Sequence, residues 1–168
     1  MDKLNRIEDW IAKELNKFAI KYLELNKKDR PPLTKSIMTI IGSYGVNEGY
    51  EVCAAGLPDL FHGEWLFDMI WYKENHEGNL KMVELVLESE MAAGIPAIKI
   101  DFEKLLLSNS NNKIMICVAG TTPINEIKDY CDNAVNTYAL MPKGERVLSL
   151  IWDDYHSGEF IPHLSIKK

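Results

Sequence analysis

The chain has 168 residues, of which 46% are hydrophobic and 26% are charged, a composition typical of a folded domain rather than of a disordered chain. This length suits a single domain with one hydrophobic core. Acidic residues outnumber basic ones by 25 to 19, and the net charge of −6 argues against an all-over cationic surface. Any contact with nucleic acid is therefore expected to be local.

Cysteine spacing and the N-terminal segment indicate where the protein works. Cys53, Cys117 and Cys131 are scattered and form no C-x-x-C motif, which favours buried free thiols in a reducing compartment over disulfides or a zinc site. The segment MDKLNRIEDW lacks the apolar core of a signal peptide, and no apolar run is long enough to span a bilayer. We therefore expect a cytoplasmic protein with no membrane partner.

The N-terminal segment, residues 1–44, is predicted to form two helices. Apolar residues recur every three or four positions over 4–22, which is the period of an amphipathic helix. The prolines at 31–32 end this helix, because proline lacks a backbone donor and restricts the residue before it. A second, shorter helix is expected to have Thr34 as its N-cap and to end at Gly42.

The core segment, residues 50–140, begins where the apolar period changes to two, as in a β-strand. In chain order, we predict strands over 50–54, 64–72 and 81–91, a helix over 101–107, a strand over 113–118 and a helix over 122–140. The second and third strands form an antiparallel hairpin around Gly78.

A β-hairpin over 145–166 completes the chain, and Pro162 marks its second strand as an edge strand. The whole is expected to be one α/β domain of order ααβββαβαββ, with a central mixed sheet flanked by helices. Trp65, Trp71 and Trp152 alternate with other apolar residues, so we expect them in the core rather than stacked on bases.

Three carboxylates are expected to crowd one face of the central hairpin. Because side chains alternate across a strand, Glu88 and Glu90 share a face, and a hairpin centred on Gly78 places Asp68 directly opposite Glu88. Crowded carboxylates repel, so either one of them has a raised pKa or a cation compensates them. Oxygen ligands suit Mg²⁺ or Mn²⁺, which can activate water for attack on phosphorus. A solvated strand face without chemistry is the other interpretation.

Four segments occur in a suggestive order: Phe67-Asp68, then Leu85-Val86-Leu87-Glu88-Ser89-Glu90, then Asp101-Phe102-Glu103-Lys104-Leu105-Leu106, then Lys113-Ile114-Met115-Ile116. In order, spacing and element type they resemble the PD-(D/E)XK, or restriction-endonuclease-like, nuclease superfamily. The resemblance implies a core of a helix, three antiparallel strands, a helix and a further strand. It also implies a Mg²⁺-dependent endonuclease that hydrolyses phosphodiester bonds in DNA.

The resemblance assigns roles to four side chains. Asp68 and Glu88 would bind the metal ion, and Glu90 stands where most members carry a lysine, where it would orient or deprotonate the attacking water. Lys104 either supplies the missing positive charge or is a surface lysine on an amphipathic helix. Asp101 is expected to be the N-cap of that helix.

Further carboxylates are weaker candidates. Glu51, in the preceding strand, is a possible additional ligand. Glu64 lies four residues before Asp68, about 13 Å along an extended strand, which is too far to share the same ligand shell unless a bulge intervenes. It is a candidate for binding a second ion or a phosphate-linked water, and a solvated carboxylate is the other interpretation. Asp59 belongs to a literal Pro-Asp dipeptide, but the hairpin register places it beyond the end of the partner strand.

Four basic residues near the first interhelical turn are candidates for contact with the DNA backbone: Lys27, Lys28, Arg30 and Lys35. A solvated helix end is the other interpretation of this cluster. The chain has few arginines, so we do not expect the monomer to read DNA sequence tightly. Cleavage of both strands of a duplex needs two active sites, which favours a homodimer or a specificity partner.

An alternative function is a catalytically inactive nuclease-fold protein that serves as an interaction or regulatory subunit. The missing lysine and the acidic net charge favour this alternative.

Overall fold

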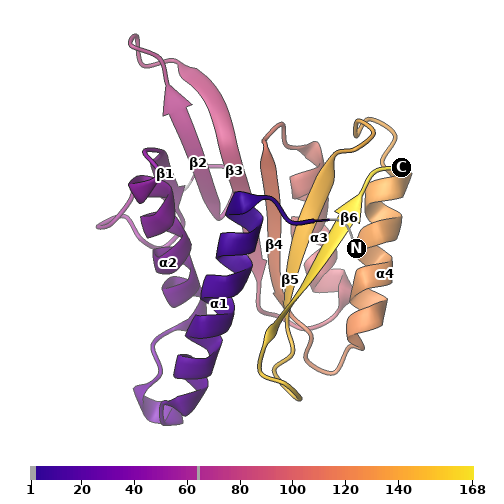
Figure 1. The fold of residues 1–168 in the computed structure, drawn as a ribbon. Helices are drawn as coiled ribbons and strands as arrows, with labels where there is room; N and C mark the ends of the chain where they lie inside the picture. The colour runs from indigo at the N-terminus through magenta and orange to yellow at the C-terminus, as the bar shows by residue number, and fades with distance from the viewer. Residues whose placement is uncertain (1–2, 64) are drawn as a thin grey trace.

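The computed structural model describes residues 3–63 and 65–168. A six-stranded mixed β-sheet runs through the molecule, with its strands side by side in chain order and two helices on each face (Figure 1). The predicted mixed sheet flanked by helices and the order ααβββαβαββ are confirmed.

The helices and strands have the following bounds: α1 (Arg6–Glu24), α2 (Leu33–Asn47), β1 (Glu51–Ala54), β2 (Met69–Glu74), β3 (Leu80–Glu90), α3 (Ile95–Leu107), β4 (Asn112–Val118), α4 (Ile124–Thr137), β5 (Arg146–Trp152) and β6 (Phe160–Ile166). A short 3₁₀ helix, η1 (Lys27–Asp29), lies between α1 and α2.

The direction of the strands explains where the helices lie. Strands β1, β2 and β3 pair antiparallel, β3, β4 and β5 pair parallel, and β6 returns antiparallel to β5. Parallel neighbours need a crossover connection, and α3 and α4 provide the two crossovers. Crossovers of the same hand that progress in one direction place their helices on one face of the sheet. The other face is therefore left for α1 and α2, which cover it in Figure 1.

Each face of the sheet has its own hydrophobic core. Leu87 and Trp71 pack with α1 and α2, whereas Val86 and Ile70 pack with α3 and α4, as alternation along a strand requires. Strand β4 is buried along its whole length, because helices cover both of its faces.

Several predicted boundaries were wrong, each for a packing reason. Helix α2 has Pro32 rather than Thr34 as its N-cap, and it continues past Gly42, whose missing side chain leaves room for the ring of Phe61. Strand β2 begins at Met69 instead of residue 64, since the backbone turns at Leu66 with a φ of 68°.

Helix α3 begins earlier than predicted, with Gly94 as its N-cap and Pro96 in its first turn. Asp101 therefore lies inside the helix, and the prediction that it is the N-cap was wrong.

Predictions about burial had mixed outcomes. Trp71 is fully buried, but Trp65 is 39% exposed, so its expected place in the core was wrong. All three cysteines are free and buried, and Pro162 lies in the edge strand β6, as predicted. None of the helices in the described part of the chain is long and apolar enough to cross a membrane.

Candidate active site

Asp68 and Glu88 lie where β2 begins and β3 ends. The pairing of β2 with β3 begins at Met69 with Leu87, and Asp68 lies in a bend one residue before the first paired residue. Its carboxylate contacts Ser89, so Asp68 lies beside the end of β3, while its direct pairing with Glu88 stays a prediction. Two irregularities shift the register nearer the hairpin turn, between Trp71 and Tyr72 and between Lys73 and Glu74. The predicted register therefore holds only at the base of the hairpin, from Met69 to Trp71.

Backbone hydrogen bonds fix the position of Asp68. Its Oδ2 accepts a hydrogen bond from the backbone N–H of Ser89 at 2.8 Å, and its carbonyl accepts one from Ala55 N at 2.8 Å. The first bond ties the carboxylate to the end of β3, and the second ties the start of β2 to the segment after β1. Asp68 is half-buried on the α3 side of the sheet, which is the side of its strand neighbour Ile70.

Glu88 is fully buried. Its Oε1 accepts a hydrogen bond from Lys104 Nζ at 3.1 Å, whereas its Oε2 is buried and has no hydrogen-bond partner among the described residues. Burial, and secondly the negative charge of Asp68, raise the pKa of Glu88 to about 7, while the Lys104 ammonium acts in the opposite direction. A carboxyl group buried in this way with one unpartnered oxygen is energetically costly unless a cation or proton joins it.

Lys104 reaches the carboxylates from helix α3. This helix leads from the end of β3 back to the start of β4, and Lys104, in its last turn, reaches Glu88. Lys104 Nζ lies 2.8 Å from Oδ1 of Asp101, which is three residues earlier on the same helix. The Asp101 hydrogen bond, together with Glu88, raises the pKa of Lys104, so its ammonium stays charged. The three-residue spacing of Asp101 and Lys104 is the sequence signal that could have predicted this ion pair. The expected role of Asp101 as an N-cap hid that signal, because it placed Asp101 outside the helix.

Glu90 has a separate local contact. It shares the face of Glu88 by alternation, but its Oε1 accepts a hydrogen bond from the backbone N–H of Ala92 at 2.6 Å. Within residues 3–63 and 65–168, no three His, Cys, Asp or Glu side chains form a group able to hold a metal ion. The structure therefore brings Asp68 near Glu88 without the expected three-carboxylate cluster.

The weaker candidates lie elsewhere or outside the described residues. Glu51 pairs with Tyr72 in the sheet, well along the hairpin from Asp68, and its Oε2 lies 3.0 Å from His62 Nε2. Asp59 lines an open cavity that also contains Glu51 and His62. Glu64 falls outside the described residues.

The basic residues gather on and beside η1, at the end of the sheet opposite the tip of the β2–β3 hairpin (Figure 1). Lys27, Lys28 and Lys35 are exposed. Arg30 instead holds the turn together, because its guanidinium donates to the carbonyls of Leu23 at 2.9 Å and Leu25 at 3.1 Å. The basic turn follows α1, whereas Asp68 and Glu88 lie under α3 on the other face of the sheet.

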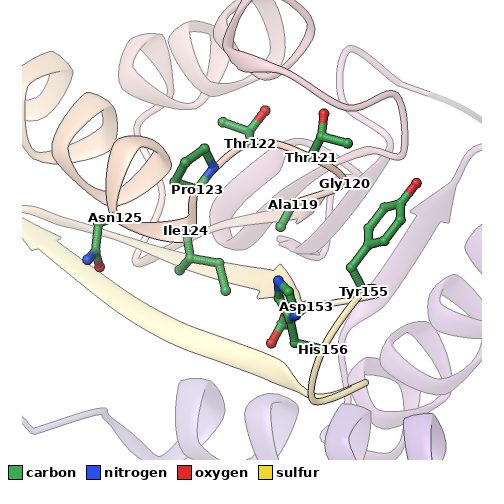
Figure 2. A pocket seen from close by; sticks show the side chains of 10 residues that line it. All are labelled: Ala119, Gly120, Thr121, Thr122, Pro123, Ile124, Asn125, Asp153, Tyr155 and His156. Carbon is green, nitrogen blue, oxygen red and sulfur yellow. The ribbon is translucent and has the colours of Figure 1, made fainter.

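A cavity of about 540 Å³ opens at the carboxyl ends of β4 and β5. Figure 2 shows the segment 119–125 on one side of it and Asp153, Tyr155 and His156 on the other. Parallel strands commonly bind ligands at this edge. Asp68, Glu88 and Lys104 do not line the cavity, so it is distinct from the carboxylate site.

No protein-family model, curated protein or solved structure matches this chain. Its function therefore has to be inferred from its own residues.

Proposed function

We propose that the chain is a Mg²⁺- or Mn²⁺-dependent endonuclease with a restriction-endonuclease-like core, which hydrolyses phosphodiester bonds in DNA. The observation that carries this proposal is the buried Glu88 carboxylate, whose unpartnered Oε2 lies in a site shared with Asp68 and Lys104. The succession of a helix, three antiparallel strands, a helix and a parallel strand supports the core assignment.

The residues present fit a hard divalent cation. Mg²⁺ is usually held by one or two carboxylates and completes its coordination with water, so the Asp68–Glu88 pair is sufficient without a third ligand. A cation beside Glu88 would also compensate the repulsion from Asp68 that raises the pKa of Glu88. The bound ion supplies a Lewis acid that polarises a phosphoryl oxygen and lowers the pKa of water.

The remaining side chains supply positioning and charge. Asp101 anchors Lys104, whose side chain is 44% exposed. Its ammonium is therefore accessible to a phosphate oxygen while one hydrogen bond holds Glu88 in place. The Ala92 N–H orients the carboxylate of Glu90, whose second oxygen is proposed to accept a hydrogen bond from the attacking water. Exposed Lys27, Lys28 and Lys35, beside Arg30, are proposed to contact the DNA backbone, with a second subunit supplying the other active site.

The test is cleavage of plasmid and linear DNA by the purified protein, together with Mg²⁺ binding by isothermal titration calorimetry. We expect cleavage that needs Mg²⁺ or Mn²⁺, stops in chelator and falls by about 10²-fold or more in Asp68→Asn and Glu88→Gln. Glu77→Gln, in the exposed hairpin turn, is the matched control and should retain activity. Wild-type protein that neither binds Mg²⁺ nor cleaves DNA would refute the proposal.

The second candidate is an inactive nuclease-fold subunit. Two contacts favour it: Lys104 already gives Glu88 a cationic partner from within the chain, and Glu90 is engaged with its own loop. In that case calorimetry should detect no Mg²⁺ binding that depends on Asp68 and Glu88.

A further inference from the structure

Leu66 combines a strained backbone with an exposed side chain. It is the one residue other than glycine with a positive φ in the described part of the chain, at 68°, and it is 75% exposed. A side chain with a Cβ is strained in this backbone region, where glycine or asparagine is usual. Strained residues of this kind concentrate at functional sites, so the backbone conformation singles out Leu66 among the exposed leucines.

Contacts of the two neighbouring residues anchor the backbone on both sides of Leu66. The N–H of Phe67 donates to the carbonyl of Trp65 at 2.9 Å, which closes a tight γ-turn with Leu66 at its centre. On one side, the Trp65 ring packs edge-on against the ring of Tyr72, with centroids 5.7 Å apart. On the other side, Phe67 packs against the core under α3. Both legs of the turn are thus anchored while its tip projects into solvent.

The tip also lies close to the candidate active site. Leu66 precedes Asp68 by two residues, so their Cα atoms are at most about 7 Å apart. Because the two Cα atoms are this close, a phosphate bound at Asp68 would place the adjacent base step near the Leu66 side chain.

We propose that Leu66 is a wedge that inserts between stacked base pairs beside the phosphodiester bond that is cleaved. Leucine is one of the apolar residues that proteins insert at base steps to unstack and kink a duplex. The γ-turn favours insertion because its two anchored neighbours leave the Leu66 side chain exposed, which lowers the cost of ordering this segment on binding. This inference rests on the proposed endonuclease function and adds that the substrate is duplex DNA opened at one step.

The experiment follows 2-aminopurine fluorescence in duplexes labelled at the step next to the mapped cleavage position, with Ca²⁺ in place of Mg²⁺ to hold the complex uncleaved. Wild-type protein should raise the fluorescence several-fold by unstacking the labelled base. Leu66→Ala keeps the Cβ and removes the wedge, so it should abolish the rise. Leu66→Met restores a long apolar side chain and should recover it. Leu140→Ala removes another leucine that is 80% exposed and should behave as wild type.

Cleavage assays with Mg²⁺ complete the test. Leu66→Ala should lower kcat/KM on a fully paired duplex by about tenfold and have little effect on a duplex with a mismatch at the same step, because the mismatch is already unstacked. Normal cleavage and fluorescence in Leu66→Ala would overturn the wedge and leave the endonuclease standing, and would point to a protein contact at this tip. Absence of DNA binding by the wild type would overturn both. Circular dichroism melting verifies that each variant is folded.

Discussion

Glu88 makes the stability of this protein depend on pH. Its pKa is about 7 in the folded state and near 4.5 in an unfolded chain. Between these values the folded protein binds a proton that the unfolded chain has released, so stability falls as the pH rises from about 4.5 to 7. Above pH 7 the charged carboxylate remains buried, and its contribution stays at its least favourable value.

Glu88→Gln should therefore stabilise the protein at about pH 8 in chelator, by on the order of 1–3 kcal/mol, because an amide carries no charge to desolvate. Urea denaturation at about pH 5 and about pH 8 measures this effect. The gain of the variant should shrink at the lower pH, where wild-type Glu88 holds a proton. Mg²⁺ should raise the melting temperature of the wild type and leave that of the variant unchanged. A variant less stable than wild type at the higher pH would contradict this assignment.

Lys104 competes with a metal ion for Glu88 and, in our proposal, assists the reaction. Lys104→Met should lower kcat by about 10²-fold, as loss of one charge-stabilising donor does in other enzymes. It should also tighten Mg²⁺ binding, because the competing ammonium is gone. Lys99→Met is the matched control, since Lys99 lies on the same helix and pairs with exposed Glu103. Weaker Mg²⁺ binding in Lys104→Met would be inconsistent with this role.

At the scale of elements, the contact between α2 and the sheet depends on a missing side chain. A Cβ on Gly45 would lie 2.6 Å from Cε2 of Trp71, and Trp71 is fully buried and edge-packed against Tyr44. The helix can therefore lie directly on the indole of β2. Gly42, which was expected to end this helix, in the same way leaves room for Phe61. Both glycines serve close packing rather than helix termination.

Gly45→Ala should destabilise the fold by about 1–3 kcal/mol through overpacking, partly offset by about 1 kcal/mol from the better helix propensity of alanine. Thermal unfolding in chelator gives the comparison. Gly63→Ala serves as the control, because a Cβ there meets nothing within 4 Å. Equal melting temperatures for Gly45→Ala and Gly63→Ala would contradict this prediction, because they would mean that α2 can move away from the Trp71 indole at no cost in stability.

At the scale of the whole molecule, the net charge of −6 opposes contact with a polyanion, so binding has to depend on the few exposed lysines. Replacing Lys27 and Lys28 together by alanine should reduce the slope of log K against log salt by about 1.8, because each phosphate that a lysine neutralises contributes about 0.9 to the slope. Fluorescence anisotropy of a labelled duplex measures this slope. Replacing Lys13 and Lys17 together by alanine is the control, because these lysines form ion pairs with acidic residues on α1. An unchanged slope in the first variant would remove the basic turn from the DNA interface.

The sequence by itself determined the order of the elements and the faces of the strands. Both follow from local rules, the apolar period and the two-residue alternation. The predicted register also holds where Met69 pairs with Leu87, but the turn alone does not set it, because two irregularities shift the pairing between the turn and Met69. The free, buried cysteines followed from their spacing in the same way.

Only the tertiary structure decided the burial of Glu88, the partners of Lys104 and the strain at Leu66. These depend on where α3 lies over β3 and on how Trp65 and Phe67 pack, which are contacts between distant segments. The cost of desolvating a carboxylate, likewise, arises from everything packed around it rather than from its neighbours in the chain.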